Sequence, residues 1–448
     1  MSEEVAGRSV GYFEVLRNNQ NFRRLWIGRV ISQTGDWFNS VALFTLLLSL
    51  TGSSESIGYI LILKLLPTFF VGPLAGVVAD RFNRKTIMIV TDLLRGVLVL
   101  GFLLVQSPDQ VWLVYVITAI EVVLLSFFEP AESAAVPSIV SREELLSANG
   151  LSGASWSVTL AFGAALGGFV TGAFGRNTAF VIDALSFLVS AAYISAVRFP
   201  SPPPERGRSE KRLSLAEATG VTDFIEGARY LRSNLPVMAL LLVKSGWGLG
   251  GGVLLLLTIF GKQEFPLGRE GSASIGLLYA SRGFGALIGP VIARWITSGA
   301  PRTMRQSIGV AFFVSALFYL LVAHSTSLPM VMLFVIGAHA GGSIQWVFST
   351  TLLQMIVPNK FLGRVFALEI ALLTLSMSVS TYFTGYGLDH AALSVRQMAT
   401  IMGITFVIPG VIWFMLQRWL DRVEASNADR APSIIEAEPA TETSFPPP

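Results

Sequence analysis

The chain has 448 residues, of which 52% are hydrophobic and only 14% are charged. An ordinary globular domain carries about 25% charged residues, so this composition excludes a water-soluble globular protein. The absence of cysteine excludes disulfides and thiolate metal sites, and we expect neither a metal nor another cofactor.

Most of the sequence falls into twelve apolar stretches that are long enough to cross a bilayer, which takes about 20 helical residues. They cover residues 25–50, 56–79, 86–106, 111–135, 148–173, 178–197, 237–260, 272–296, 306–324, 328–349, 362–386 and 395–417. A membrane strand would alternate polar and apolar residues, and these stretches do not. The sequence therefore predicts an all-α membrane protein with twelve transmembrane helices.

The basic residues are distributed unevenly between the loops. Most of them lie in residues 1–24, in every second loop after that segment, and near the C-terminus. By the positive-inside rule this bias places both termini in the cytoplasm. Because topology accounts for these cations, we expect no nucleic-acid partner. The first 24 residues hold four arginines and no apolar core, so we also expect no cleaved signal peptide.

The first predicted helix carries a polar face. Its members recur at a spacing of three or four residues: Arg29, Ser32, Gln33, Asp36, Asn39 and Ser40. Such a face is expected to line a water-filled cavity rather than lipid. Gln33 and Asn39 are therefore cavity candidates, and Asp36, near the middle of the span, is a candidate for proton or cation coupling. The alternative is a structural carboxylate held by neighbouring helices.

The second predicted helix ends in the charged stretch GVVADRFNRK, which holds Asp80, Arg81, Arg84 and Lys85. Asp80 lies at the C-terminal end of its helix, where the helix dipole disfavours a carboxylate. It becomes favourable if another helix offers its N-terminus. The arginines and the lysine can meet acidic residues or anionic lipid at this face. The alternative is that these charges only set the topology.

The third and fourth helices carry further charges at membrane depth. Asp92 and Arg95 have the spacing of a local ion pair. In the fourth helix, Glu121, Glu129 and Glu132 share one stripe with Leu125. Because burial favours the neutral form of a carboxylate, a deep Glu121 suits proton exchange. We take Glu121 and Glu129 as coupling candidates with Asp36, and we expect Asp183 in the sixth helix to pack structurally.

The chain divides into two related halves. Residues 139–151 align without gaps to residues 356–368, and Ile57-Gly58 recurs as Ile275-Gly276 at nearly the same shift. We expect five segments: a cytoplasmic N-terminal segment, a six-helix bundle, a cytoplasmic linker with an amphipathic helix, a second six-helix bundle and a disordered cytoplasmic tail. They span residues 1–24, 25–197, 198–236, 237–420 and 421–448.

The buried ionisable residues of the second half are Lys244, Arg282, His339 and Glu369. Lys244 precedes the glycine-rich run Gly246 to Gly252, where a helix is expected to bend or pack closely. The cavity candidates of this half are Lys244, Trp247, His339 and Trp346. A lone histidine followed by two glycines is also typical of a packing residue.

Over residues 20–420 the chain resembles the major facilitator superfamily. The family signature after the second helix is met by Gly76, Asp80, Arg81, Arg84 and Lys85, with Asn83 in place of a glycine. The stretches SQTGDWFNSVAL, FFEPAESAAVPSIVSREELLSANGL and DFIEGARYLRSNLPV look most like the drug:proton antiporter branch that contains macrolide efflux proteins and the enterobactin exporter. Asn tolerates left-handed backbone angles, so we expect the tight turn at Asn83 to survive.

The resemblance implies two pseudo-symmetric six-helix bundles and a conformational latch. In this latch Asp80 meets the N-terminus of the eleventh helix in the outward-open state only, near Asn359, Gly363 and Arg364. Two patterns of the branch are missing. The fourth helix has no arginine or lysine between Trp112 and Val140, and GAALGG at residues 163–168 lacks the proline of the antiporter motif.

We therefore expect a monomeric secondary transporter of a bacterial inner membrane that exports an amphiphilic drug, macrolide or siderophore, with protons as coupling ions. Membrane lipids are its other partners. One alternative keeps the fold and changes the cargo to a metal cation or a lysophospholipid. Another is a membrane sensor or scaffold that transports nothing. The chain has no GxxxxGK[ST] motif and no zinc-protease spacing among its three histidines, so we do not expect an enzyme.

Overall fold

The computed structural model describes residues 11–199, 229–296 and 300–430, and every element in these ranges is helical. The first half contains α1 (Tyr12–Asn18), α2 (Gln20–Thr51), α3 (Ser54–Arg81), α4 (Arg84–Leu100), η1 (Gly101–Leu104), η2 (Pro108–Gln110), α5 (Val111–Ile139), α6 (Arg142–Val158), η3 (Thr159–Gly163), α7 (Ala164–Phe174) and α8 (Arg176–Ser195). The second half contains α11 (Leu235–Gly248), α12 (Val253–Gln263), η4 (Arg269–Gly271), α13 (Ser272–Ile296), α14 (Pro301–Ala323), α15 (Leu328–Ile356), α16 (Asn359–Asp389) and α17 (Val395–Arg430).

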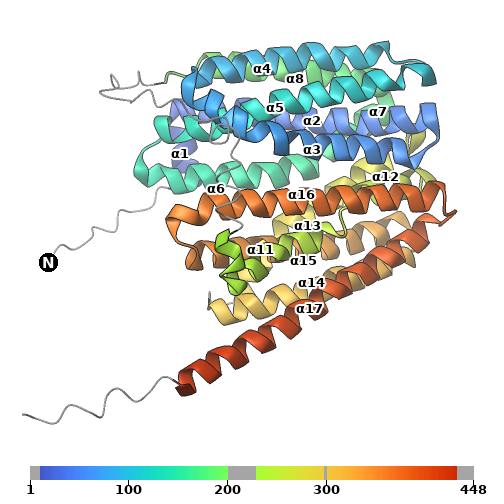
Figure 1. The fold of residues 1–448 in the computed structure, drawn as a ribbon. Coiled ribbons are helices and arrows are strands. Elements are labelled where there is room, and N and C mark those ends of the chain that lie inside the picture. The colour runs from blue at the N-terminus through green and yellow to red at the C-terminus, as the bar shows by residue number, and fades with distance from the viewer. Residues whose placement is uncertain (1–10, 200–228, 297–299, 431–448) are drawn as a thin grey trace, which may run out of the picture.

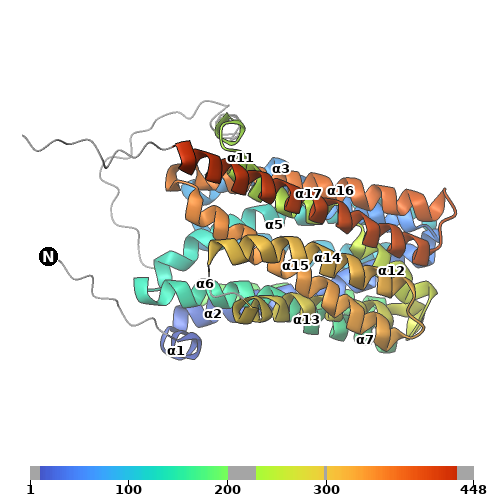
Figure 2. The same cartoon turned by 90° about the horizontal axis from the view of Figure 1, so that it is seen from below.

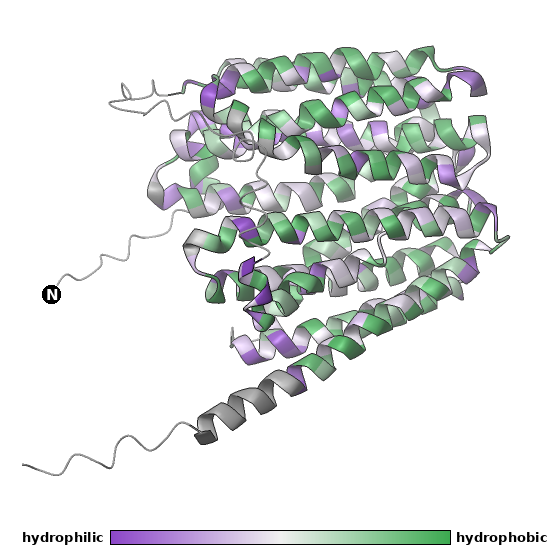
Figure 3. Ribbon diagram, viewed as in Figure 1, coloured by the Kyte–Doolittle hydropathy of each residue, from purple (hydrophilic) through white to green (hydrophobic). Residues whose placement is uncertain are grey.

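The predicted membrane architecture is confirmed. In the described ranges, 11 helical segments are long and apolar enough to cross a membrane. Helix α2 makes a twelfth segment of similar length, and Asp36 and Asn39 lower its hydropathy. Figure 3 shows apolar residues along most of the helices, with hydrophilic residues gathered mainly at their ends.

The helices form two bundles that run in one common direction (Figures 1 and 2). In the first half α2 packs on α8, α3 on α5, and α4 on both α5 and α8. In the second half α14 packs on α15 and α17, α13 on α15, and α11 on α16. The two halves meet mainly where α3 contacts α16 and where α7 contacts α13.

The two halves touch at one end of the molecule and separate toward the other. We call the end that holds the start of α2 and the end of α17 the termini side, and the opposite end the far side (Figure 1). On the far side, a Cβ atom built on Gly58 of α3 lies 3.7 Å from the carbonyl oxygen of Thr381 of α16. Toward the termini side, Gly72, Gly76 and Gly363 have nothing within 4 Å of such an atom.

The segment α6–η3–α7 is one continuous span with a π-helical turn at Thr159–Gly163. This turn ends at Gly163, the first residue of the GAALGG run in which the proline of the antiporter motif is missing. Single π-helical turns inside α-helices reshape the helix locally, as a proline does. Next to it, a Cβ atom on Gly168 would lie 2.6 Å from the carbonyl oxygen of Ser272 in α13. Glycine is thus required where the two halves come closest.

Three local expectations are resolved by the structure. The glycine-rich run breaks the seventh span, since α11 ends at Gly248 and α12 begins at Val253. Asn83 is not left-handed: its φ is −64°, and its side-chain oxygen accepts a hydrogen bond from the N–H of Thr86 at the start of α4. Helix α17 continues to Arg430, past the boundary predicted at residue 421. Most of the predicted linker helix, residues 200–228, lies outside the described residues.

Candidate functional site

The polar face of α2 meets a cation from α4 in the middle of the first half. The carboxylate of Asp36 lies 2.6 Å from Nη2 of Arg95, which is buried, while Asp36 keeps 30% of its side chain exposed. The Arg95 guanidinium also lies 4.2 Å from the ring centre of Phe187. The local pair expected between Asp92 and Arg95 is not formed among the described residues, because Arg95 points toward α2.

Around this pair lie buried acceptors that lack a hydrogen-bond partner among the described residues. Glu121 of α5 is 7% exposed, and its Oε1 makes no hydrogen bond. The same holds for Oδ1 of Asn39 and Oε1 of Gln33. On the neighbouring α3, Nζ of Lys64 donates a hydrogen bond of 2.7 Å to the hydroxyl of Ser40. The predicted polar face therefore exists and retains acceptors that a ligand or water can satisfy.

A cavity of about 310 Å³ opens beside this face, between α2, α5 and α6. Its lining consists of Trp26, Arg29, Gln33, Glu129, Glu132, Ser133, Val136, Asn149, Ser152 and Ser155. Nε of Arg29 lies 3.2 Å from Glu132, and its Nη2 lies 3.6 Å from Glu129. Glu129 is half exposed. The coupling candidate Glu129 is thus an ion-pair partner at the cavity wall, unlike the buried Glu121.

The second half carries a buried ion pair between α11 and α16. Nζ of Lys244 lies 2.7 Å from Oε2 of Glu369, and their side chains are 4% and 0% exposed. The ammonium also lies 4.3 Å from the ring centre of Trp346. Two of the predicted cavity residues, Lys244 and Trp346, are therefore in contact with each other. In this arrangement the Lys244 charge is neutralised within the protein.

His339 is bonded within the same bundle. Its Nε2 lies 2.9 Å from the hydroxyl of Tyr319, and the Trp247 ring meets it edge to face at 6.0 Å between ring centres. A Cβ atom on Gly341, two residues after His339, would meet the Ser315 hydroxyl of α14 at 2.8 Å. These contacts fit the packing interpretation of His339 and join it to Trp247.

Two of the predicted latch residues, Arg84 and Lys85, form hydrogen bonds within the first half. Nη1 of Arg84 donates to the carbonyl of Ala134, and Nζ of Lys85 donates to the carbonyls of Ser195 and Val197 at the end of α8. Both contacts lie within the first half. The side chains of Asp80 and Asn359 lie outside the described side chains.

The remaining latch residues lie on either side of the separated ends of α3 and α16. Arg81 is exposed, and Gly76 and Gly363 face open space. Arg364 lies over the ring of Phe361 within its own helix, 5.8 Å from the ring centre. The latch between Asp80 and the start of α16 therefore stays a prediction.

At the far side the two halves are joined by a carboxylate on a helix N-terminus. Asp389, the last residue of α16, accepts hydrogen bonds from the Ser53 hydroxyl at 2.7 Å and from the N–H groups of Ser54 and Glu55 at 3.1 and 2.9 Å. We call this contact the far-side cap. Beside it, Nδ1 of His390 lies 3.5 Å from Glu55.

A second contact between the halves lies at the same end of the molecule. Nη1 of Arg176, the first residue of α8, lies 3.7 Å from Oε1 of Glu270 in η4. The same nitrogen donates a hydrogen bond of 2.8 Å to the hydroxyl of Ser49 in α2. Both partners of the ion pair are partly exposed, so it contributes little by itself. It adds a second charged link at the end that the far-side cap already closes.

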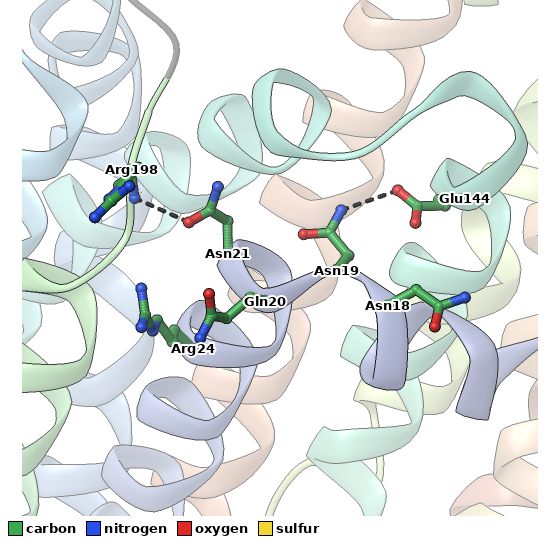
Figure 4. Close-up of a pocket in the computed structure, with 7 residues that line it drawn as sticks. All are labelled: Asn18, Asn19, Gln20, Asn21, Arg24, Glu144 and Arg198. Carbon is green, nitrogen blue, oxygen red and sulfur yellow. Dashed lines mark hydrogen bonds between the residues drawn. The ribbon is translucent and has the colours of Figure 1, made fainter.

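A separate polar pocket of about 440 Å³ lies at the termini side (Figure 4). In it, the Asn19 side chain donates a hydrogen bond of 2.9 Å to Glu144, and the N–H of Arg198 donates one of 3.0 Å to Asn21. These bonds tie the start of α2 to α6 and to the end of α8. The pocket is therefore part of the support for the first bundle and does not belong to the central site.

Sequence reasoning missed three residues of these sites. Lys64 was visible only as a lone cation in the second span, and Arg95 was assigned to a partner in its own helix. Asp389 ends the eleventh span, as Asp80 ends the second, and this similar position could have identified Asp389 as a contact residue.

The comparisons with known proteins agree with this architecture. The chain is 25% identical over 405 residues to the uncharacterised MFS-type transporter YkuC of Bacillus subtilis (strain 168), covering 89% of this chain and 92% of the relative. It is 24% identical over 392 residues to macrolide efflux protein A of Streptococcus pyogenes, covering 83% and 90%. A bacterial homologue of the human lysosomal transporter Spinster has a similar fold, with a TM-score of 0.67 at 15% identity over 90% of this chain and 98% of that one. The family model of the Major Facilitator Superfamily matches residues 25–369, and the chain belongs to this superfamily of membrane transporters.

Proposed function

We propose that the protein is a proton-coupled exporter of an amphiphilic small molecule, and that it works by alternating access between its two bundles. In this proposal the termini side faces the cytoplasm, and the described arrangement is open to the cytoplasm and closed at the far side. The protein acts as a monomer in a bacterial inner membrane. The similarity to a relative named for macrolide efflux supports an amphiphilic cargo.

The observation that carries this proposal is the contact between Asp36 and Arg95. The exposed share of Asp36 gives a proton access to the carboxylate, while Arg95 is buried. A proton on Asp36 removes the charge that Arg95 needs, and an uncompensated buried cation is unstable. Protonation therefore favours a different position of α2 relative to α4.

Helix α2 also links this pair to the contact between the halves. Trp37, the residue after Asp36, meets the Tyr279 ring of α13 edge to face at 6.2 Å between ring centres. A Cβ atom on Gly167 of α7 would lie 2.9 Å from the Cα of Phe38. Because α2 touches both α7 and α13, which form a contact between the halves, a change at Asp36 biases the arrangement of the halves.

The experiment uses the purified full chain in liposomes with a fluorescent amphiphile as the probe. One proton crossing at 100 mV supplies about 2.3 kcal/mol, which corresponds to about a fiftyfold gradient of substrate. We expect probe flux when a pH gradient is imposed. In Asp36→Asn we expect flux that no longer responds to pH.

The matched control is Asp109→Asn, which removes a carboxylate from the short helix η2 outside the cavity. It should retain the pH response of the wild type. Flux that requires ATP, or a pH response that survives in Asp36→Asn, contradicts this coupling.

A further inference from the structure

Arg282 lies in the middle of α13, at the contact between the two halves. Its side chain is 9% exposed. The guanidinium carbon lies 5.7 Å from the ring centre of Trp156, which belongs to α6 of the other half. The following residue, Gly283, packs directly against the backbone of Ala161 in η3. Arg282 is therefore buried where the halves converge, beside a helix that lines the cavity.

The other cations at similar depth have partners within the protein. Arg29 is paired with Glu129 and Glu132, Arg95 with Asp36, and Lys244 with Glu369, while Lys64 donates to Ser40. Among the described residues, the contact of Arg282 is with the Trp156 ring, and no hydrogen bond or carboxylate acts on its guanidinium. Among these five cations, Arg282 differs from the other four in lacking such a partner.

The ionisable side chains within electrostatic range of Arg282 are Tyr279, Tyr319 and His339. They are occupied elsewhere: the Tyr279 hydroxyl lies 2.8 Å from that of Thr258, and Tyr319 is bonded to His339. No carboxylate among the described residues is within ion-pair distance of Arg282. A buried guanidinium without a counter-ion is costly, so a site that retains one is suited to receive an anion from outside.

We propose that Arg282 binds the anionic group of the transported molecule, a carboxylate or a phosphate monoester. A guanidinium donates two parallel hydrogen bonds to either group, and Trp156 offers an aromatic face for the apolar part of an amphiphile. This inference rests on the proposed transport function and names its substrate class as anionic amphiphiles. In this proposal Arg282 of the second half determines the specificity for the charge of the substrate. Asp36 of the first half couples transport to protons.

The test measures binding to the purified full chain in detergent with two pairs of dansyl probes. One pair is dansyl-leucine and its methyl ester, and the other is a dansyl-alkyl phosphate and the matching alcohol. A hydrogen bond to a charged group predicts that the anion binds roughly ten- to a hundredfold tighter than its neutral partner in at least one pair. The pair that shows the preference identifies the anion as carboxylate or phosphate.

Three variants assign the preference to this residue. Arg282→Gln should bind acid and neutral probe equally, with the affinity for the neutral probe within about twofold of wild type, because only the charged bonds are lost. Arg282→Lys should keep part of the preference, since it retains the charge without the paired donors. Arg302→Gln, at an exposed position at the start of α14, should behave as wild type.

Two results overturn the inference: equal binding of anion and neutral partner by the wild type in both pairs, or a preference that persists in Arg282→Gln. The first of these results is measured on the wild type, so the inference can be tested even if Arg282→Gln does not fold. Flux of the neutral ester under a pH gradient separates this failure from that of the transport function. If that flux persists without any anion preference, the exporter proposal stands and the role of Arg282 falls.

Discussion

Asp389, the last residue of α16, accepts a hydrogen bond of 2.9 Å from the backbone N–H of Glu55 in the first turn of α3. The N-terminus of a helix carries a partial positive charge, so this carboxylate attracts the other half of the protein. The contact has the same form as the latch predicted at the opposite end, where Asp80 at the end of α3 would meet the start of α16. Helices α3 and α16 thus each carry a carboxylate at their C-terminal end.

The first prediction concerns the far-side cap. Asp389→Asn should weaken a charge–dipole contact worth about 0.3–1 kcal/mol when exposed and up to about 2 kcal/mol when partly buried. The population should shift by roughly two- to thirtyfold toward the arrangement that is open at the far side. Because the chain has no cysteine, spin labels at Gln106→Cys and Leu267→Cys can report the distance between the halves at this end.

The control for this change is Asp109→Asn, which removes a carboxylate from η2 on the same side and touches no residue of the cap. It should leave the distance distribution as in the wild type. A wild-type distribution in Asp389→Asn would show that hydrogen bonds to the neutral amide or the surrounding packing suffice to close this end.

The second prediction concerns Asp80 and has the opposite sign. If Asp80 secures α3 to the start of α16 when the termini side is closed, Asp80→Asn should favour the arrangement described in this structure. The expected shift is again roughly two- to thirtyfold. Labels at Thr86→Cys and Met355→Cys should report longer distances at the termini side. An unchanged distribution would leave the charge cluster after α3 as a topology signal only.

The positions of the helices were predictable because each membrane span must satisfy its own backbone hydrogen bonds, which requires a long apolar run. The partners of buried charges were not. Asp92 and Arg95 have suitable spacing in one helix, yet the rotation of α4 directs Arg95 to Asp36. That rotation is set by packing against α5 and α8, and no local sequence pattern encodes it.

The polar face of α2 was predictable for a different reason. Its residues recur at the period of one helix, so their common orientation follows from α-helical geometry alone. The far-side cap depends instead on residues that are hundreds of positions apart, Ser53 and Asp389, which only the tertiary fold brings together. Asn83 shows the same limit at short range, since its role as a cap of α4 replaced the expected left-handed turn.

The third prediction concerns the glycines between α7 and α13. A Cβ atom on Gly276 would collide with the carbonyl oxygen of Ala164, which belongs to a helix backbone and cannot turn aside. Gly276→Ala should therefore destabilise the contact between the halves by about 1–3 kcal/mol and open the far side.

The far-side label pair measures this effect. Gly153→Ala is the control, because Gly153 has nothing within 4 Å of an added Cβ atom. The control should leave the distances unchanged. Closed-state distances in Gly276→Ala would mean that α13 shifts to admit the methyl group.

The last prediction concerns the buried pair of Lys244 and Glu369, which are 2.7 Å apart. Lys244→Met leaves the Glu369 carboxylate buried without its cation, and removing one partner of a buried pair costs about 3–5 kcal/mol. Glu369→Gln should be costly for the converse reason. The double variant Lys244→Met/Glu369→Gln removes both charges, so its loss of stability should be smaller than the sum of the two single losses by about 0.5–3 kcal/mol.

Thermal unfolding of the purified protein in detergent, monitored by size-exclusion chromatography, measures the stability of the wild type, the two single variants and the double variant. Additive losses would show that the two charges do not stabilise each other. If the single variants unfold like the wild type but lose probe binding, Lys244 belongs to the substrate site, as the sequence first indicated.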